Sequence, residues 1–320
     1  MILINSTDED PSTNTVVRWL LKFKVPFIRL NNKAEITNYE YKNDSFNIIA
    51  NKKEINLSQV SAYWYRRGEF RIPIKVPKVS FAFNTAYRDY INGEMASLKH
   101  FLADYLKEKV FSIGDSLSCI NVNKHIVLNK AKHHGLNIPD YTITCKRKTL
   151  QCFYNVHLSI VTKPLHNPFY YSNDSDWYPT YTTELTPEVI QELPETFAPT
   201  LLQKKIEKKF EVRSFFLMDV FYTMAIFSQN DDQTKTDFRN YNKEKPNRTV
   251  PFKLPEEVEV KLRNLMFDLG FESGSIDLIY DKNNSFYFLE VNPVGQFGMT
   301  SIPCNYFLEE KLALRLINPM

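Results

Sequence analysis

The sequence predicts a mixed α/β (α+β) protein that is divided into more than one lobe. The first thirty residues read as a β-α-β unit, with apolar strands over Met1–Asn5 and Pro26–Leu30 and a helical stripe over Thr15–Lys24 between them. Near the other end, two β-rich apolar runs flank the turn residues 281–285, which predicts a hairpin. The chain has 320 residues, 43% of them hydrophobic, so its length allows a large core and suggests two domains or fused lobes.

Residues 1–117 read as one α/β lobe. Weak alternation over Ile36–Leu57, with the turn residues Asn43-Asp44 in its middle, predicts a hairpin. A further strand covers Val60–Tyr65, and a long helical pattern runs from Phe81 to Lys109.

The remaining residues divide into a central unit, 118–198, and a C-terminal unit, 199–320. In the central unit Gly135 stands where the C-terminal cap of a helix belongs. Residues 166–184 are rich in Tyr, Asn, Asp and Ser and read as a surface loop or hairpin, and residues 229–250 read as a loop. The periodic segments predict helices at 123–134, 187–193, 256–269 and 305–317, and strands at 141–145, 158–163, 210–218 and 220–228.

Composition excludes several classes of protein. The net charge is only +3, from 40 basic and 37 acidic residues, so the bulk charge does not indicate a nucleic-acid partner. The four cysteines have no CxxC spacing, and reduced thiols in the cytoplasm are the simplest interpretation. The N-terminus turns acidic after a short apolar run, which is unlike a signal peptide, and no apolar run reaches the length of a membrane span. We therefore expect a soluble cytoplasmic protein.

The C-terminal hairpin carries the clearest chemical signal. If its turn is centred on Asn283-Asn284, Asp277 lies directly opposite Glu290, and Asn292 shares the face of Glu290. Opposed like charges are unfavourable, and neither strand contains an Arg or Lys to offset them. A hard divalent cation suits two carboxylates and an amide oxygen, and Mg²⁺ shared with substrate phosphates fits so sparse a ligand set. The alternative is a surface hairpin with two solvated acids.

A magnesium site of this kind implies a phosphate-bearing partner. The sequence contains no GxxxxGK[ST] loop and no GxGxxG after a strand, so the common backbone cradles for phosphate are missing. Lysine and arginine side chains must then meet the phosphate charge. Lys124, Lys163 and Arg213 stand at predicted strand or helix positions rather than in charge runs. Each of them taken singly could equally be a surface side chain.

The order of these features resembles the ATP-grasp superfamily over roughly residues 118–300. More narrowly, the chain is similar to the microviridin-type graspetide synthetases, and in particular to the ATP-grasp peptide maturases of GRASP-with-SPASM systems. The strings that carry the likeness are PTLLQKKIEKKFEVRSFF, AIFSQ, DFRNY and LEVNPVGQFG. One departure is Lys204-Lys205, which replaces the acidic-aromatic pair usual at this hinge.

The resemblance implies an ATP-grasp fold, with an N-terminal pre-ATP-grasp lobe and ATP held between the central and C-terminal lobes. ATP and Mg²⁺ are the implied cofactors. Asp277, Glu290 and Asn292 would hold the metal. The nucleotide would contact Lys124, Lys163, the hinge residues Gln203, Lys204, Lys205 and Ile206, and Glu211 near the ribose. Arg213 and Arg239 would stabilise charge on the γ-phosphate and on an acyl phosphate.

The implied activity is an ATP-dependent peptide macrocyclase. It would phosphorylate Asp or Glu side chains of a ribosomal precursor peptide, leader plus core, and join them to Ser/Thr or Lys side chains as esters or amides. Arg66 and Arg67 would face the acidic core peptide, or would merely close a buried strand with surface charge. The family also implies a homodimer. Two alternatives remain: a ligase that adds a free amino acid to a small acid or protein tail, and a non-catalytic nucleotide-binding regulatory module.

Overall fold

Several β-sheets organise the part of the chain that the structure describes. The structure is a computed structural model, and it describes residues 1–73, 81–120, 122–165, 170–172, 177–179, 182–229 and 244–319. Within these ranges the strands form sheets of four, three, four and five strands and a two-stranded ribbon. Across the same residues, no helix combines the length and the apolar character that crossing a membrane requires.

The N-terminal lobe is built on a parallel four-stranded sheet in the order β2-β1-β6-β7. Its strands are β1 (Ile2–Ser6), β2 (Phe27–Leu30), β6 (Ala62–Arg66) and β7 (Phe111–Ile113). Helix α1 (Pro11–Lys22) begins before the expected Thr15, because the Asp10 side chain caps it by accepting the N–H of Thr13. The predicted β-α-β opening is thus confirmed.

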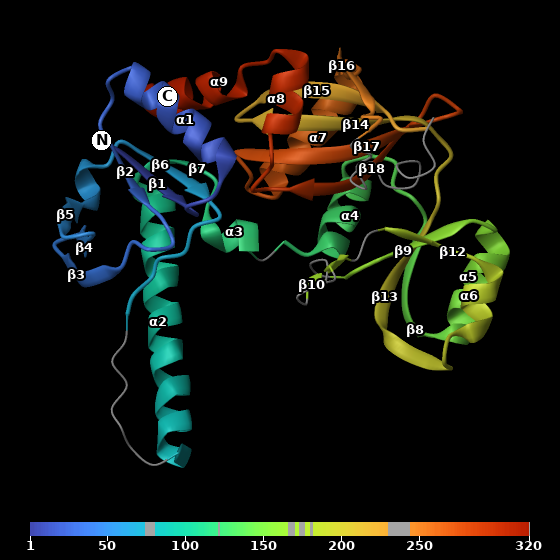
Figure 1. Cartoon of the computed structure of the whole chain (residues 1–320), viewed down its shortest axis with the longest axis horizontal. Helices are drawn as coiled ribbons and strands as arrows, with labels where there is room; N and C mark the ends of the chain where they lie inside the picture. Colours follow the sequence, from blue (N-terminus) through green and yellow to red (C-terminus); the bar gives the residue numbers. More distant parts are fainter. Residues whose placement is uncertain are drawn as a thin grey trace.

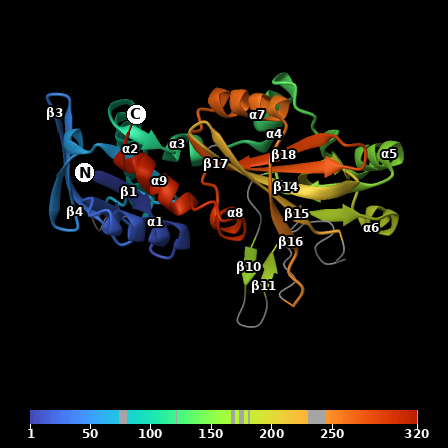
Figure 2. The ribbon, with the colours of Figure 1, turned by 90° about the horizontal axis from the view of Figure 1, so that it is seen from above.

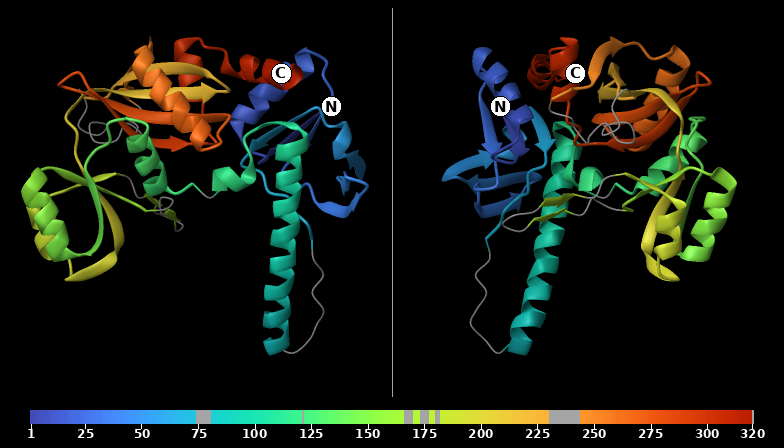
Figure 3. Two further views of the ribbon diagram at one scale, coloured as in Figure 1. Left: turned by 180° about the vertical axis from the view of Figure 1, so that it is seen from behind. Right: turned by 45° about the vertical axis from the view of Figure 1, so that its right-hand side comes forward.

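Two different layers cover the faces of this sheet. One face packs against α1 and against α9 (Leu308–Ile317), so the end of the chain returns to its beginning (Figure 1). The other face packs against α2 (Phe81–Lys109) and a small sheet of β3, β4 and β5. The small sheet and the turn after it are β3 (Ile36–Lys42), β4 (Ser45–Ala50), β5 (Lys53–Asn56) and the 3-10 turn η1 (Leu57–Gln59). Figure 3 shows that α2 extends well beyond the lobe.

The central lobe is an antiparallel sheet in the order β12-β9-β13-β8, with two helices on one face. Its elements are β8 (Tyr141–Lys146), α5 (Arg147–His157), β9 (Ile160–Lys163), β12 (Thr183–Leu185), α6 (Pro187–Glu192) and β13 (Thr196–Lys204). Strand β13 runs through the boundary expected at 198 and pairs with both β8 and β9. The ribbon of β10 (Tyr170–Ser172) and β11 (Trp177–Pro179) lies between β9 and β12 in the chain. Helices α5 and α6 stand at the end of the molecule opposite the N-terminal lobe (Figure 2).

The C-terminal lobe is an antiparallel five-stranded sheet in the order β16-β15-β14-β17-β18. Its elements are β14 (Lys208–Leu217), β15 (Val220–Phe227), β16 (Arg248–Phe252), α7 (Glu256–Asp268), β17 (Ser273–Asp281), β18 (Phe286–Asn292) and α8 (Gly298–Cys304). Helix α7 and the earlier α4 (Lys124–His133) cover one face of this sheet, where Leu128 and Leu262 are buried together. Between β7 and α4 lies the short helix α3 (Ser116–Ile120).

Candidate active site

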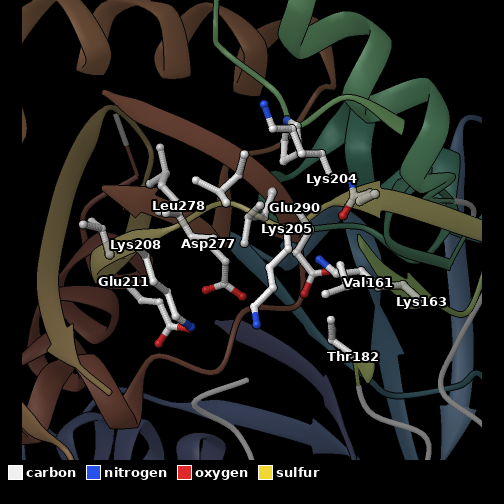
Figure 4. A pocket seen from close by; sticks show the side chains of 16 residues that line it. Val161, Lys163, Thr182, Lys204, Lys205, Lys208, Glu211, Asp277, Leu278 and Glu290 are labelled. Carbon is white, nitrogen blue, oxygen red and sulfur yellow. The ribbon is translucent and has the colours of Figure 1, made fainter. Parts of the chain in front are cut away.

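A cleft between the central sheet and the C-terminal sheet gathers most of the predicted site residues. It encloses about 720 Å³, including space that is open to solvent. Eight of the predicted residues line it: Lys163, Gln203, Lys204, Lys205, Ile206, Glu211, Asp277 and Glu290. Figure 4 shows that these side chains come from both walls and from the connection between β13 and β14. Residues more than a hundred positions apart in the sequence therefore meet in one cavity.

The acid pair, Asp277 and Glu290, lines the cleft on the side of the C-terminal sheet. Asp277 of β17 lies directly opposite Glu290 of β18, which confirms the predicted register. The pairing between Asp277 and the turn differs from the expected one. Pairs near the turn are shifted by one residue, and a bulge before Glu290 restores the expected alignment. The bulge compensates for a turn that is not centred on Asn283-Asn284.

Basic residues from neighbouring elements offset the charge of these acids. Arg213 of β14 lies opposite Asp277, and its Nη1 donates to both carboxylate oxygens at 2.8 and 3.1 Å. The Nζ of Lys124, in the first turn of α4, is 3.9 Å from the carboxylate of Glu290. The two hairpin strands contain no Arg or Lys, as the sequence shows, so other elements supply the positive charge. Both cations come from outside the hairpin, where the pattern of the hairpin residues could not reveal them.

Arg213, Asp277 and Glu290 make one row across three adjacent strands. β14 pairs with β17 and β17 pairs with β18, and the three residues stand at matching positions. Since opposed residues of paired strands share a face, all three project from the same side of the sheet. The row therefore brings two carboxylates and a guanidinium together on one face of the sheet.

The hinge between the two sheets closes one side of the cleft. Gln203 ends the buried part of β13 and is 2% exposed. The N–H of Lys204 donates to the Asp140 carbonyl at 2.8 Å, and the N–H of Lys205 donates to the Ser159 carbonyl at 3.0 Å. These two amide groups thus hold the hinge to the central lobe.

The unusual hinge lysine has an acidic partner. Lys205 Nζ donates to Glu184 of β12 at 2.5 Å, and the other carboxylate oxygen of Glu184 accepts from the Ser159 hydroxyl at 2.9 Å. Lys205 and Thr182, which precedes β12, both line the cleft. The charge of Lys205 is therefore balanced by Glu184 of the central lobe.

A buried ion pair lies beside the row and was missed by the sequence analysis. Lys208 and Glu211, at the start of β14, are 8% and 6% exposed, and the Lys208 Nζ donates to Glu211. The Ser228 hydroxyl donates to the second oxygen of Glu211 at 2.9 Å. The sequence places Lys208 in the run Glu-Lys-Lys, which reads as a solvated charge run. The sequence signal that could have indicated the pair is that Lys208 stands three residues before Glu211.

The predicted lysines at the starts and ends of elements take the expected positions. Lys163 ends β9 and lines the cleft. Lys124 opens α4, and the Asn123 side chain caps that helix by accepting the N–H groups of His125 and Ile126. Burial, together with the charge of Lys124, lowers the pKa of His125. The imidazole is therefore neutral at neutral pH.

The remaining predicted residues lie outside the cleft lining. Asn292, at the end of β18, accepts the N–H of Gly295 at 3.2 Å through Oδ1. Arg66 is 1% exposed and buried against Asp10, so the structure does not place it where a peptide could reach it. Arg67 is exposed, with a positive φ of 66°. Arg239 and the string DFRNY lie outside the described residues, as does most of the loop from 166 to 184.

The oxygen donors of the row suit magnesium. The side chains of Asp277 and Glu290 are 14% and 21% exposed, so both carboxylates reach the cleft while most of their surface is covered. Carboxylate oxygens are hard ligands, and Mg²⁺ is usually bound by one or two of them together with substrate phosphates and water. Arg213 donates to the carboxylate of Asp277 and Lys124 lies beside that of Glu290, and such outer partners orient the ligands of a metal.

Comparisons with known proteins identify this architecture. No protein-family model matches the sequence, and a search of curated proteins gives no match. Solved structures do match along the whole chain. A Chryseobacterium gregarium RiPP-associated ATP-grasp ligase, solved with ADP and with a leader and core peptide, is 23% identical. It superposes with a TM-score of 0.78 over 98% of this chain and 94% of its own.

Two further solved structures also match along the whole chain. The macrocyclase MdnC of Microcystis aeruginosa MRC, bound with the precursor peptide MdnA, is 25% identical, with a TM-score of 0.79 and full coverage of both chains. The ATP-grasp ligase PsnB, solved with a minimal precursor, Mg and ADP, is 15% identical, with a TM-score of 0.73 over 99% of this chain and 96% of that one. The protein therefore has the fold of the ATP-grasp ligases. More particularly, its fold matches ligases and a macrocyclase that were solved with precursor peptides, as the sequence motifs predicted.

Proposed function

We propose that the protein is an ATP-dependent peptide macrocyclase of the graspetide-synthetase type. The row of Arg213, Asp277 and Glu290 carries the proposal, because its two carboxylates share a single cleft with the hinge and Lys163, and Arg213 bonds to Asp277. Charge of both signs is thus arranged for a nucleotide phosphate and its metal. The match of fold and length to a macrocyclase bound with its precursor peptide supports a peptide as the acceptor.

In the proposed complex the purine lies between the hinge and apolar side chains of both sheets. Val161, Ile206 and Ile279 supply that apolar lining. Glu211 would accept from the ribose, held in position by Lys208 and Ser228. Lys124, Lys163 and Arg213 would steady the phosphates, together with Arg239. Asp277, Glu290 and Asn292 would hold Mg²⁺, which when bound neutralises phosphate charge.

The chemistry then needs positioning more than covalent help from the protein. A carboxylate oxygen of an Asp or Glu side chain in the peptide attacks the γ-phosphorus, and the bond to the bridging oxygen breaks to release ADP. The acyl phosphate formed is attacked at its carbonyl carbon by a Ser/Thr hydroxyl or a Lys amine of the same peptide. The nucleophile loses its proton and phosphate leaves. Each ester or amide cross-link removes the elements of one water from the peptide.

Mass spectrometry of a precursor peptide tests this function. The probe is a short Thr/Asp/Glu-rich or Lys/Glu-rich peptide encoded beside the gene for this protein, incubated with the enzyme, ATP and Mg²⁺. We expect the peptide to lose the mass of one water for each cross-link and ADP to form only when the peptide is present. Recovery of unmodified peptide with that precursor would contradict the proposal.

Glu290→Gln is the matched inactive variant. The substitution keeps the size of the side chain but removes one carboxylate of the acid pair. We expect turnover to fall at least ~100-fold, because a catalytic metal contributes several kcal/mol to phosphoryl chemistry. Circular dichroism should show an unchanged fold. If ADP forms instead with a free amino acid and a small acid, the amino-acid ligase is correct. Nucleotide binding without any turnover would indicate the regulatory module.

Location and assembly follow from the same proposal. An enzyme that consumes ATP and a ribosomal peptide would work in the cytoplasm, where both are made. The homodimer that the resemblance implies would be measured by light scattering during size-exclusion chromatography of the purified chain.

A further inference from the structure

Arg66 is a buried arginine that the proposed reaction does not use. It ends β6 in the N-terminal lobe, and only 1% of its surface is exposed. Its Nε donates to Asp10 at 3.1 Å, and its Nη2 donates to the Ser12 hydroxyl at 3.2 Å. Asp10 is itself fixed, because it accepts from the backbone and the hydroxyl of Thr13 at 2.8 and 2.6 Å. One side of the guanidinium is thus anchored to the start of α1.

The other side of the guanidinium reaches the C-terminal lobe. Nη1 of Arg66 donates to the carbonyls of Val294 and Gly295. The guanidinium carbon also lies 5.5 Å from the centre of the Phe297 ring, within the range of a cation–π contact. Residues 293–297 form the loop directly after β18, the strand that carries Glu290 and Asn292. A single side chain of the N-terminal lobe therefore holds the loop that follows the metal-binding strand.

The loop has little freedom to move on its own. Gly295 has a φ of +51°, and a Cβ at this position would lie 2.9 Å from the Ser275 nitrogen and 3.1 Å from the Phe215 ring. Its N–H donates to the side chain of Asn292. The position of the Gly295 peptide thus sets the orientation of the Asn292 amide. Arg66 donates a hydrogen bond to the carbonyl of Gly295.

The ion pair at the anchored end is charged under ordinary conditions. Burial raises the pKa of Asp10, but the charge of Arg66 and the hydrogen bonds from Thr13 and Arg66 outweigh it, and the net pKa is below the usual value. A carboxylate and a guanidinium that are both buried and ionised keep each other in a narrow geometry. The anchor is therefore rigid at neutral pH.

We propose that Arg66 is a positioning residue, through which the N-terminal lobe fixes the loop 293–297 and orients Asn292 for the metal. The metal role of Asn292 rests on the proposed function, whereas the grip on the loop does not. The inference replaces the expected role of Arg66 as a peptide contact, which its burial opposes.

Amide hydrogen exchange tests the grip without nucleotide or peptide. The variant is Arg66→Lys, which keeps the charge beside Asp10 but cannot form the fork of bonds to Asp10, Ser12 and both carbonyls. We expect exchange over residues 292–298 to be about tenfold faster than in the wild type, because the loop loses hydrogen bonds that oppose its local opening. Arg71→Lys is the control, because Arg71 lies in the same lobe, is 59% exposed and pairs with Glu35 at the surface. Equal exchange in the two variants would overturn the proposal.

Asp10→Asn is the second variant for the exchange experiment, and it is used if Arg66→Lys does not fold. The side chain of Asp10 accepts hydrogen bonds from Thr13 and Arg66, and Arg66 is the one of these two that bonds to the loop, so faster exchange at residues 292–298 in this variant would indicate transmission through Arg66. Changes confined to the start of α1 would overturn the proposal.

Calorimetry with the non-hydrolysable analogue AMP-PNP tests the consequence for the metal. We expect Arg66→Lys to reduce the gain in affinity that Mg²⁺ confers by about tenfold, with the affinity in the absence of Mg²⁺ unchanged. An unchanged gain would contradict the effect on Asn292. If the wild-type protein does not bind AMP-PNP, the proposed function fails, and the exchange measurement alone decides whether Arg66 holds the loop.

Discussion

At the scale of single residues, the Lys208–Glu211 pair combines burial with charge inside the cleft. Both side chains are buried, and Ser228 adds a hydrogen bond to Glu211. Bringing two charges out of water is costly, and their mutual attraction repays the cost only when both partners are present. The pair therefore orients Glu211 toward the cleft. The loss of either partner would destabilise the fold.

Replacing Lys208 with Met should destabilise the protein by about 3–5 kcal/mol, because the buried carboxylate of Glu211 loses its cation. The double variant Lys208→Met/Glu211→Gln should recover a large part of that loss. Urea denaturation of both single variants and the double variant measures the coupling.

The exposed pair Lys282–Glu207 provides the control for this cycle. Its side chains are 66% and 76% exposed. Lys282→Met should leave the denaturation midpoint unchanged, because water screens such a pair. A Lys208→Met variant as stable as Lys282→Met would show that the buried pair does not act as described.

At the scale of elements, local chemistry accounts for most of the hairpins. The predicted turn at Asn43-Asp44 is confirmed, and both residues have positive φ, at 52° and 57°. Asn51 and Lys52 join β4 to β5 in the same way, with φ of 51° and 61°. The first residue pair is typical of such turns, whereas a lysine at positive φ is not. The third strand was therefore not predicted.

Lys52→Gly should stabilise the protein by about 0.5–1 kcal/mol. The left-handed conformation costs a lysine roughly 1–2 kcal/mol, and the greater entropy of glycine in the unfolded chain offsets part of the gain. Thermal unfolding measures the change. Lys53→Gly is the control, since Lys53 is equally exposed but lies in β5, where glycine weakens the strand. A lower melting temperature for Lys52→Gly would contradict this account of the turn.

Helix α5 shows why some elements are not predicted from the sequence. It begins after Lys146, whose side chain makes no capping hydrogen bond, so the usual start signal is missing. It ends at Leu158, which adopts a φ of 61° where glycine is the common choice. The same residue was assigned to the following strand, which in fact begins at Ile160. Packing of Leu150 against Leu202 and Ile190 decides this helix instead.

At the scale of the whole molecule, a partly buried acid connects the first and last lobes. Glu272, just before β17, accepts the N–H of Gly114 at 3.2 Å. Burial raises the pKa of Glu272, and the nearby Asp115 adds to the effect, while hydrogen bonds and Lys107 oppose it. The folded protein thus holds this proton more tightly than the unfolded chain does. Ionisation of Glu272 therefore costs stability as pH rises through the interval between the unfolded and folded pKa values.

Glu272→Gln should raise the melting temperature at pH 7, because the amide keeps an acceptor for Gly114 without the partly buried charge. The advantage over the wild type should disappear as pH falls below the unfolded pKa, where the wild-type carboxyl is protonated in both states. Calorimetric melting between pH 4 and 7 tests this. Glu108→Gln, at an exposed position of α2, is the control and should leave the pH dependence unchanged. An advantage that persists at low pH would count against the assignment to Glu272.

The sequence by itself determined the α/β class, most elements, the opposition of Asp277 and Glu290, and the lysines that open or end their elements. These features depend on periods of two and 3.6 residues and on turn chemistry, which act between residues close in the chain. Only the tertiary structure decided that Arg213 and Lys124 face the acids, that Lys208 is buried, and that Arg66 grips the loop after β18. Those contacts join residues that are distant in the chain or whose burial is set by packing. Their register depends on how whole sheets and lobes meet, which local pattern does not encode.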